Sequence, residues 1–411
     1  MRKYGCVGKK LTHSFSREIH SRLADYKYEL IELDEEEMSS FFTEKKFEAV
    51  NVTIPYKQSV MSYLDVISEK AKKIGAVNTV VNKNGTLYGY NTDYYGIKAL
   101  VERAGLDLSH RKVLILGSGG TSKTAREVSK DLGASEILIV SRKNKAEFIT
   151  YEEAATVHSD AQIIINTTPV GMYPDCDSSP IDLSYFGELE GVIDVVCNPL
   201  STNLILDARS RGIKAEGGLY MLVMQAAVAV EKFLGSEICA EKIEAVYRSV
   251  LEEKENIVLV GMPGSGKSTV GKLINLTGYT LVDTDAEIEA RCGTSIKELI
   301  STKGEKYFRD LESEVIRDVS SRQSLIISTG GGAVLREENV TRLKHSGKIF
   351  FLDAPLSRLC ATSDRPLSDT EDKLKCLYDE RIDIYRAVSE VVVPDMTPEA
   401  EAEFILEKRR G

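Results

Sequence analysis

The sequence predicts an α/β protein with three domains in two functional units. Short apolar runs alternate with polar or helical stretches along most of the chain, which is typical of parallel, doubly wound sheets. Two glycine-rich loops, residues 117–122 and 261–269, each follow an apolar strand. A chain of 411 residues is long for one hydrophobic core and suits two or three.

The composition and charge of the chain disfavour several classes of binding partner. The formal net charge is -10 and the pI is about 5.3, which disfavours nucleic acid because a phosphate backbone needs a basic surface. No apolar run reaches the roughly 20 residues of a membrane span, and the N-terminus lacks a signal-peptide core. Seven cysteines without a C-x-x-C pair indicate reduced thiols and no zinc site. We expect a cytoplasmic protein that binds small molecules, and a homodimer remains open.

The first unit begins with an irregular α/β region. Strands are expected at 28–33, 49–54, 77–81 and 87–90, the last two joined by a turn at Asn82–Gly85. A regular alternation follows, with strands at 113–116, 137–140, 163–166 and 192–196. The helices expected at 221–233 and 239–251 return to the N-terminal region. The pattern predicts a substrate-binding domain over 1–100, completed by 226–251, and a dinucleotide-binding domain over 101–225.

The second unit follows the charged stretch Glu252-Glu253-Lys254-Glu255. Strands are expected at 257–260, 280–282, 324–328, 348–352 and 390–393. A third domain with a parallel sheet is therefore predicted over 256–411.

The first loop, Gly117-Ser118-Gly119-Gly120, has the form of a dinucleotide loop. The next strand ends in Ser141-Arg142-Lys143. An acid at this point binds the ribose 2′-hydroxyl of NAD, whereas a basic residue accommodates the 2′-phosphate of NADP. NADP is therefore favoured, although basic residues after a strand can also be surface charges only.

Several ordered motifs in residues 1 to about 250 resemble shikimate dehydrogenase. They are 8–16 (GKKLTHSFS), 51–57 (NVTIPYK), 75–79 (GAVNT), 91–93 (NTD), 166–172 (NTTPVGM) and 217–225 (GGLYMLVMQ). The resemblance implies a Rossmann NADP domain and NADPH-dependent reduction of 3-dehydroshikimate to shikimate.

The resemblance also assigns residues. Lys57 and Asp93 match the catalytic pair that flanks the reacting oxygen, where an ammonium donates a proton and a carboxylate positions it. Substrate-binding positions are matched by Ser14, Ser16, Thr53, Asn78 and Gln225. Cofactor-binding positions are matched by Gly117, Gly119, Gly120, Ser141, Arg142, Lys143 and Gly218. Arg17 replaces the family's usual proline, and Cys197 replaces its usual substrate-contacting tyrosine.

The second loop fits the Walker A pattern G-x-x-x-x-G-K-[ST] at every position, between an apolar strand and an amphipathic helix. Its backbone N–H groups cradle the phosphates of ATP, Lys267 meets the β- and γ-phosphates, and Ser268 offers a hydroxyl to Mg²⁺. The predicted ATP-binding residues are Gly261, Gly264, Ser265, Gly266, Lys267, Ser268 and Thr269.

Residues 256–411 resemble shikimate kinase. The motifs are 282–285 (VDTD), 304–312 (GEKYFRDLE), 330–332 (GGG), 364–367 (DRPL) and 380–381 (ER). By this resemblance Asp285 binds the ring hydroxyls and orients the attacking one, Asp283 assists magnesium, and Arg365 closes a lid over ATP. The substrate's carboxylate and ring are assigned to Arg309, Arg381, Gly331 and Gly332, arginine's fork being matched to a carboxylate. Asp383 replaces a usual proline, and the stretch 351–365 is shorter than usual.

Together the motifs predict a bifunctional enzyme that makes shikimate and then phosphorylates it to shikimate 3-phosphate. Two alternatives remain open. The dehydrogenase half could be weak or prefer quinate, or the Walker domain could be a nucleotide-sensing module that regulates a dehydrogenase.

The basic residues after the second strand of the dinucleotide-binding domain predict that NADP outcompetes NAD. A charge-assisted contact with phosphate contributes roughly 1.5–3 kcal/mol, about tenfold to a hundredfold in efficiency. Arg142→Asp should narrow or invert the preference, measured as kcat/KM with each cofactor. Equal efficiency with both cofactors in the unmodified protein would contradict this prediction.

Overall fold

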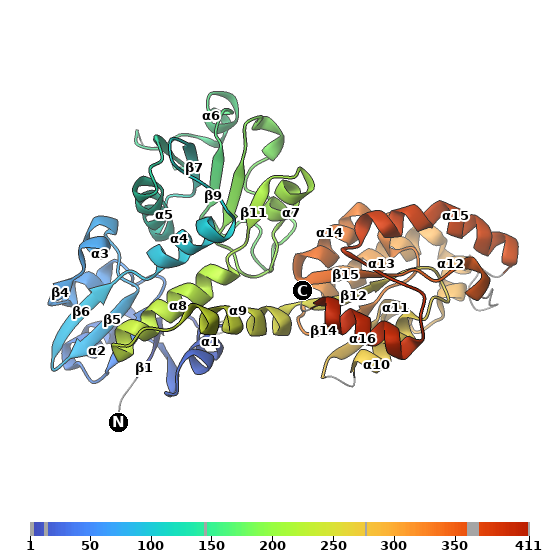
Figure 1. The fold of residues 1–411 in the computed structure, drawn as a ribbon, viewed down its shortest axis with the longest axis horizontal. Coiled ribbons are helices and arrows are strands. Elements are labelled where there is room, and N and C mark those ends of the chain that lie inside the picture. The colour runs from blue at the N-terminus through green and yellow to red at the C-terminus, as the bar shows by residue number, and fades with distance from the viewer. Residues whose placement is uncertain (1–3, 12–14, 144–145, 276–277, 360–369, 410–411) are drawn as a thin grey trace. The chain divides into compact units, whose positions relative to one another are not determined.

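The computed structural model describes residues 4–11, 15–143, 146–275, 278–359 and 370–409 (Figure 1). The chain forms two compact units. The first comprises Met1–Asn198 and Thr202–Val250, and the second comprises Pro199–Ser201 and Leu251–Gly411. Both are mixed α/β, as the sequence predicts.

A six-stranded sheet opens the first unit. Its strands are β1 (Tyr4–Gly8), β2 (Tyr28–Glu32), β3 (Ala49–Val52), β4 (Val66–Ile67), β5 (Thr79–Lys83) and β6 (Thr86–Tyr90), in the order β2-β1-β3-β5-β6-β4. β1 pairs in parallel with β2 and β3, whereas β5 is antiparallel to β3 and β6. Asn84 and Gly85 join β5 to β6 with φ of 52° and 86°, the left-handed pair that a tight hairpin turn needs.

Helices cover this sheet and connect it to the second one. They are α1 (Ser16–Leu23), α2 (Glu35–Glu44), α3 (Glu69–Ile74), α4 (Asp93–Arg103) and α8 (Leu219–Leu234). α8 is apolar around most of its surface and packs on the sheet, with Ala229 and Phe233 against Tyr4 and Tyr28.

The second sheet of the first unit is fully parallel, in the order β11-β10-β9-β7-β8. Its strands and helices are β7 (Lys112–Leu116), β8 (Glu136–Val140), β9 (Ile163–Asn166), β10 (Gly191–Asp194), β11 (Lys214–Glu216), α5 (Gly120–Asp131), α6 (Tyr151–Thr156) and α7 (Asn203–Ser210). The inner strands are buried along their length, which explains their near-continuous apolar runs. The strand order changes direction between β7 and β9, and ligands of such sheets bind outside the carboxyl ends of the strands at this point.

The second unit has its own parallel sheet, which includes β12, β14 and β15 (Figure 1). The strand order is β13-β14-β12-β15-β16. The strands are β12 (Asn256–Val260), β13 (Thr280–Asp283), β14 (Leu325–Ser328), β15 (Gly347–Leu352) and β16 (Val391–Val393). The helices are α10 (Lys267–Asn275), α11 (Thr284–Cys292), α12 (Ile296–Lys303), α13 (Glu305–Ser320), α14 (Glu337–Ser346), α15 (Glu371–Val388) and α16 (Pro398–Arg409). In this sheet the strand order changes direction between β12 and β15.

Short 3-10 turns complete the fold. They are η1 (Ser59–Tyr63), η2 (Leu183–Tyr185), η3 (Ala333–Leu335) and η4 (Leu356–Arg358). Across the described ranges, no helix has the length and apolar character required to cross a bilayer.

Three strands escaped the sequence analysis. β1 contains two glycines, β4 has only two residues, and β11 is short and polar. None carries the apolar alternation or run by which a strand is recognised. These segments form strands because they pair with neighbouring strands, and not because of their own β-propensity.

The charged stretch before β12 is helical. α9 (Ala240–Lys254) continues through Glu252 and Glu253, and β12 begins at Asn256. The Tyr279 hydroxyl donates to the Glu252 carbonyl at 2.8 Å, and Ser324 Oγ donates to the Glu253 carbonyl at 2.5 Å. Burial raises the pKa of Glu255 to about 7. This stretch is therefore more than a spacer, because its backbone is bonded to the second unit.

These bonds predict where the second unit can be cut. Fragment 251–411 should be more stable than 256–411 by about 1–3 kcal/mol, since the shorter fragment lacks both carbonyl acceptors. Urea unfolding of each fragment measures the difference. Tyr279→Phe should destabilise the longer fragment by about 1 kcal/mol and leave the shorter one unchanged. Equal effects in both fragments would mean that the Tyr279–Glu252 bond does not contribute.

Candidate active sites

The first candidate site lies where the chain leaves the mixed sheet. Lys57 follows β3, and Asp93 is the first residue of α4. The Lys57 ammonium donates to Oδ2 of Asp93 at 2.6 Å, with side-chain exposures of 21% and 9%. Such a pair keeps a charged nitrogen near the surface while its carboxylate stays largely desolvated. The catalytic pair assigned from the sequence is therefore in direct contact.

Neighbouring polar groups extend this pair into a buried network. Asn78 Nδ2 donates to Oδ1 of Asp93 at 2.9 Å and to the Thr92 hydroxyl at 3.0 Å. Oε1 of Gln225, on α8, lies 3.4 Å from the same hydroxyl. The network thus joins four of the assigned residues, the Lys57–Asp93 pair with Asn78 and Gln225. It also includes Thr92, which belongs to one of the motifs but had no predicted role.

The other assigned substrate positions stay predictions. Ser16 is the first residue of α1 and is half-buried. Thr53 follows β3, and its amide donates to the Val7 carbonyl at 2.9 Å. Ser14 lies outside the residues that the structure describes.

The dinucleotide loop occupies the switch point between β7 and β9. Gly117 has φ of 102°, and a Cβ there would lie 2.9 Å from Cγ2 of Thr168. Gly119 caps α5, and the space around Gly119 and Gly120 is open. The N-terminus of a helix presents free N–H groups to an anion. The geometry fits a pyrophosphate at this point.

A hydroxyl pair connects the two loops of this site. Ser141 Oγ donates to Ser118 Oγ at 3.0 Å and accepts from the Lys143 amide at 3.1 Å. Arg142 and Lys143 are exposed beside it. Ser118 was not assigned from the sequence, although a hydroxyl inside the glycine loop was a visible signal. A cluster of two cations and two hydroxyls is suited to a phosphate monoester.

Gly218, the last assigned cofactor position, caps α8. A Cβ there would lie 2.3 Å from the Val195 carbonyl oxygen. The glycine is required by close packing between α8 and the segment after β10.

The second candidate site is built on the Walker loop between β12 and α10. Gly261, Gly264 and Gly266 have φ of 150°, 85° and 92°. A Cβ on Gly261 would lie 2.9 Å from Ser265 Oγ and 3.0 Å from the Leu352 carbonyl at the end of β15. Lys267 is buried, and its ammonium donates to the Gly261 and Met262 carbonyls at 2.9 Å. The loop is therefore curled around its own lysine.

A set of oxygen atoms beside the loop fits a divalent cation. Ser268 Oγ donates to Oδ2 of Asp283 at 2.6 Å, and Ser328 Oγ lies within 3.2 Å of both. Asp283 also caps α11 by accepting from the Asp285 amide. Mg²⁺ binds through one or two protein oxygens together with water and phosphate. Ser268 and Asp283 are thus suited to hold it, and their role as metal ligands stays a prediction.

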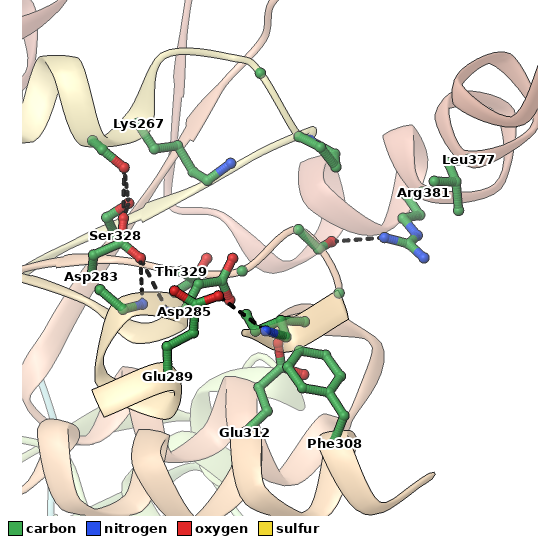
Figure 2. Close-up of a pocket in the computed structure, with 18 of the residues that line it drawn as sticks. Lys267, Asp283, Asp285, Glu289, Phe308, Glu312, Ser328, Thr329, Leu377 and Arg381 are labelled. Atoms are coloured by element: carbon green, nitrogen blue, oxygen red, sulfur yellow. Dashed lines mark hydrogen bonds between the residues drawn. The ribbon is translucent and has the colours of Figure 1, made fainter. Parts of the chain in front are cut away.

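One cavity of about 550 Å³ joins the Walker loop to the predicted acceptor residues (Figure 2). Lys267, Asp283, Asp285, Arg309 and Arg381 all line it. Its apolar lining comes from Ile296, Ile300, Phe308 and Leu377. A phosphate-binding loop and two arginines therefore line the same cavity.

The glycine triplet after β14 holds the arginines. A Cβ on Gly332 would lie 2.2 Å from the Arg309 guanidinium, so a larger residue there would displace this side chain. Arg381 Nη1 donates to the Gly331 carbonyl at 3.2 Å, and the Tyr385 hydroxyl donates to the same oxygen. Gly331 and Gly332 therefore position the cations, besides lining the cavity.

Glu312 is the residue that sequence reasoning missed. It was quoted in a motif but given no role, yet it is fully buried and its Oε2 accepts from Arg309 Nη1 at 2.8 Å. Burial raises the pKa of its carboxyl, and Arg309 opposes this shift. The signal was present as an i, i+3 pair on an amphipathic helix, but pattern alone could not show its burial. Arg365 lies outside the described residues.

The chain has relatives over both units. The family model for shikimate kinase matches residues 263–408, and the model for the shikimate dehydrogenase substrate binding domain matches residues 6–80. A shikimate dehydrogenase (NADP(+)) of Clostridium beijerinckii is 38% identical over 271 residues, which are 62% of this chain and 99% of that protein.

Solved structures resemble the first part of the chain. A chorismate mutase/shikimate 5-dehydrogenase fusion protein from Clostridium acetobutylicum aligns with a TM-score of 0.58 and 34% identity, over 61% of this chain and 98% of that one. Shikimate 5-dehydrogenase from Thermus thermophilus, in complex with NADP(H) and shikimate, aligns with a TM-score of 0.54 and 27% identity, over 61% and 99%.

The Arg309 contacts predict that its two carboxylate partners, Glu312 and Glu305, contribute unequally to the free energy of unfolding. Glu312→Ala should lower the free energy of unfolding of the second unit by about 3 kcal/mol, because it removes the buried carboxylate that bonds to Arg309 at 2.8 Å and leaves the half-exposed Glu305 as the remaining partner. Glu305→Ala should cost less than about 1 kcal/mol, since Glu305 is 50% exposed and its bond to Arg309 is 3.3 Å long. Urea unfolding of both variants tests this, and equal losses would contradict it.

Proposed function

Because this chain belongs to the shikimate dehydrogenase family and its second unit carries a shikimate kinase domain, we propose that it is a bifunctional shikimate-pathway enzyme. The first unit reduces 3-dehydroshikimate to shikimate with NADPH. The second transfers a phosphoryl group from ATP to shikimate, which gives shikimate 3-phosphate. One observation carries the proposal: each compact unit brings its own predicted reactive groups together, the Lys57–Asp93 pair in the first and the cavity lined by Lys267, Arg309 and Arg381 in the second.

The first unit's chemistry centres on Lys57. Bound NADPH supplies the hydride that adds to the carbonyl carbon. Lys57 donates a proton to the oxygen on which negative charge develops, and in the reverse direction takes the hydroxyl proton back. Asp93 holds the ammonium at 2.6 Å and stabilises its charge. The carboxylate and the remaining hydroxyls are proposed to be bound by Ser14, Ser16, Thr53, Asn78 and Gln225.

Cofactor binding in the first unit follows the two loops. The N-terminus of α5 receives the pyrophosphate, with Gly119 and Gly120 allowing close approach. Arg142 and Lys143 receive the 2′-phosphate, which supports the choice of NADP.

The second unit's chemistry is positioning and charge stabilisation. ATP would supply the phosphoryl group, and Ser268 and Asp283 would hold Mg²⁺. Arg309 and Arg381 bind the acceptor's carboxylate, and Asp285 orients the attacking hydroxyl and accepts its proton as the new P–O bond forms and ADP leaves. Lys267 stabilises the charge on the β- and γ-phosphates. The lid role of Arg365 rests on the sequence.

The cavity also bears on the nucleotide-sensing alternative. A module that only senses a nucleotide needs the phosphate loop, but it does not need two arginines on the far wall of the same cavity. Arg309 and Arg381 therefore favour catalysis on a carboxylate acceptor. Small-molecule substrates and a cytoplasmic location complete the proposal.

Two assays on the purified chain test the proposed function. One measures NADPH formation with shikimate and NADP, with quinate as the competing substrate. The other measures ADP formation with ATP, Mg²⁺ and shikimate. Activity in only one assay would reduce the proposal to a single enzyme, and faster turnover of quinate would select the quinate-preferring alternative.

The separate sites predict separable activities. Lys57→Ala should lower dehydrogenase turnover by about a hundredfold or more and leave kinase turnover near normal, because the general acid and its substrate belong to one unit. Lys267→Ala should do the reverse. Lys72→Ala, an exposed lysine paired with Glu69, is the matched control and should change neither activity. A folded variant that loses both activities would contradict the two-enzyme proposal.

A further inference from the structure

The backbone carbonyl of Gly331 accepts hydrogen bonds from two side chains of α15. Arg381 Nη1 donates to it at 3.2 Å (Figure 2), and the Tyr385 hydroxyl donates to the same oxygen. Arg381 and Tyr385 lie one helical turn apart, so they share a face of the helix. A carbonyl oxygen has two lone pairs. These two donors therefore use its full capacity and hold it from one side.

Tyr385 is itself fixed in place. It is fully buried, and its ring stacks on Phe351 of β15 with the ring centroids 5.3 Å apart and the planes 14° from parallel. Burial raises the pKa of the Tyr385 hydroxyl to about 12, and Arg381 opposes this shift. The hydroxyl is therefore protonated at neutral pH and acts as a donor to the carbonyl.

Arg381 depends on the same oxygen for its orientation. It is 5% exposed and lines the cavity. Arg309 has two carboxylate partners, Glu312 and Glu305, whereas no carboxylate of the described residues forms an ion pair with Arg381. Its Nε is buried without a hydrogen-bond acceptor in the described part of the chain. The positive charge of Arg381 is thus left for an anion in the cavity, and the Gly331 carbonyl orients the group that carries it.

The held carbonyl also determines the direction of an N–H group. The peptide that joins Gly331 to Gly332 is trans and planar, so its carbonyl and its N–H point in opposite directions. A Cβ on Gly331 would lie 2.9 Å from Cδ of Pro263, which places this peptide directly against the Walker loop. Tyr385 and the Walker loop together therefore limit the rotation of the peptide and fix the direction of the Gly332 N–H.

We infer that Tyr385 is a positioning residue for the acceptor of the kinase reaction, acting through the Gly331 carbonyl on Arg381 and on the Gly332 N–H. The inference rests on the proposed kinase function of the second unit and deepens it. Tyr385 is not among the residues that line the cavity, so it acts on the acceptor only through other groups. Its effect belongs in acceptor affinity, because Arg381 and the glycine triplet hold the acceptor in the ground state and the transition state alike.

Steady-state kinetics of ADP formation by the full chain, with ATP, Mg²⁺ and shikimate, test the inference. Tyr385→Phe removes one oxygen atom and keeps the ring. It should raise KM for shikimate about threefold to tenfold, the effect of losing one hydrogen bond. Because the loss concerns uniform binding of the acceptor, kcat and KM for ATP should stay within about twofold of wild type. The dissociation constant of shikimate, measured by calorimetry, should also rise.

Two further variants separate the hydroxyl from the packing around it. Tyr378→Phe makes the same chemical change on the same helix, at a half-buried residue that does not line the cavity, and it should alter none of these constants. Phe351→Leu removes the ring that stacks on Tyr385 but leaves the hydroxyl in place. It should lower the melting temperature while KM for shikimate stays within about twofold of wild type. Thermal melting of each variant shows whether it is folded.

The outcomes are distinct. An unchanged KM for shikimate in Tyr385→Phe, or an equal rise in Phe351→Leu, would overturn the positioning role while the proposed kinase function stands. A matching rise in KM for ATP, or a Tyr385→Phe chain that does not fold, would also overturn it, because the hydroxyl would then serve the structure of the unit as a whole. An unmodified chain that forms no ADP with shikimate would overturn the proposed kinase function and this inference with it.

Discussion

Both nucleotide sites depend on one backbone constraint, a left-handed turn at the first residue after a central parallel strand. Gly117 follows β7 with φ of 102°, and Gly261 follows β12 with φ of 150°. At each position a side chain would meet the neighbouring segment, Thr168 after β9 in one case and the Leu352 carbonyl of β15 in the other. Only glycine combines this conformation with this approach. The turn directs the next helix so that its N-terminus faces the switch point of the sheet, and the phosphate contacts that we propose for the N-termini of α5 and α10 follow from that direction.

Two buried carboxylates in the candidate sites are paired with cations. Asp93 bonds to Lys57 and Asn78, and Glu312 bonds to Arg309. A buried charge without a partner would be costly, so Lys57 and Arg309 each have a carboxylate that holds them in place. The glycine triplet adds a steric limit, because the Arg309 guanidinium occupies the space of a Gly332 side chain. The position of each cation in these sites therefore depends on its carboxylate partner, and for Arg309 also on the glycine triplet.

The sequence predicted what is local. Strand-helix alternation, the Walker pattern and the order of motifs predicted the fold class and singled out Lys57 with Asp93 and Ser268 with Asp283, because each of these signals lies in a short stretch of sequence. Side-chain pairs and buried positions that arise only after folding could not be predicted. Glu312 resembles any charged residue on a helix until its burial is known, and Ser118 meets Ser141 only because β7 and β8 are neighbours. The role of Glu252 and Glu253 was missed because their main-chain carbonyls carry it, and a carbonyl has no sequence signal.

If both proposed activities belong to one chain, the fact that one reaction supplies the substrate of the next does not by itself explain the fusion. The product of the first unit is the acceptor of the second, so equal amounts of the two enzymes are guaranteed by translation alone. Tethering adds a local concentration that is at most in the millimolar range for two sites on short connections. That increment matters only when the free intermediate is scarce relative to the KM of the kinase, because a saturated second site gains nothing from a higher local concentration. Any advantage of the tether should therefore be greatest at low flux, when shikimate released from the first unit is most dilute.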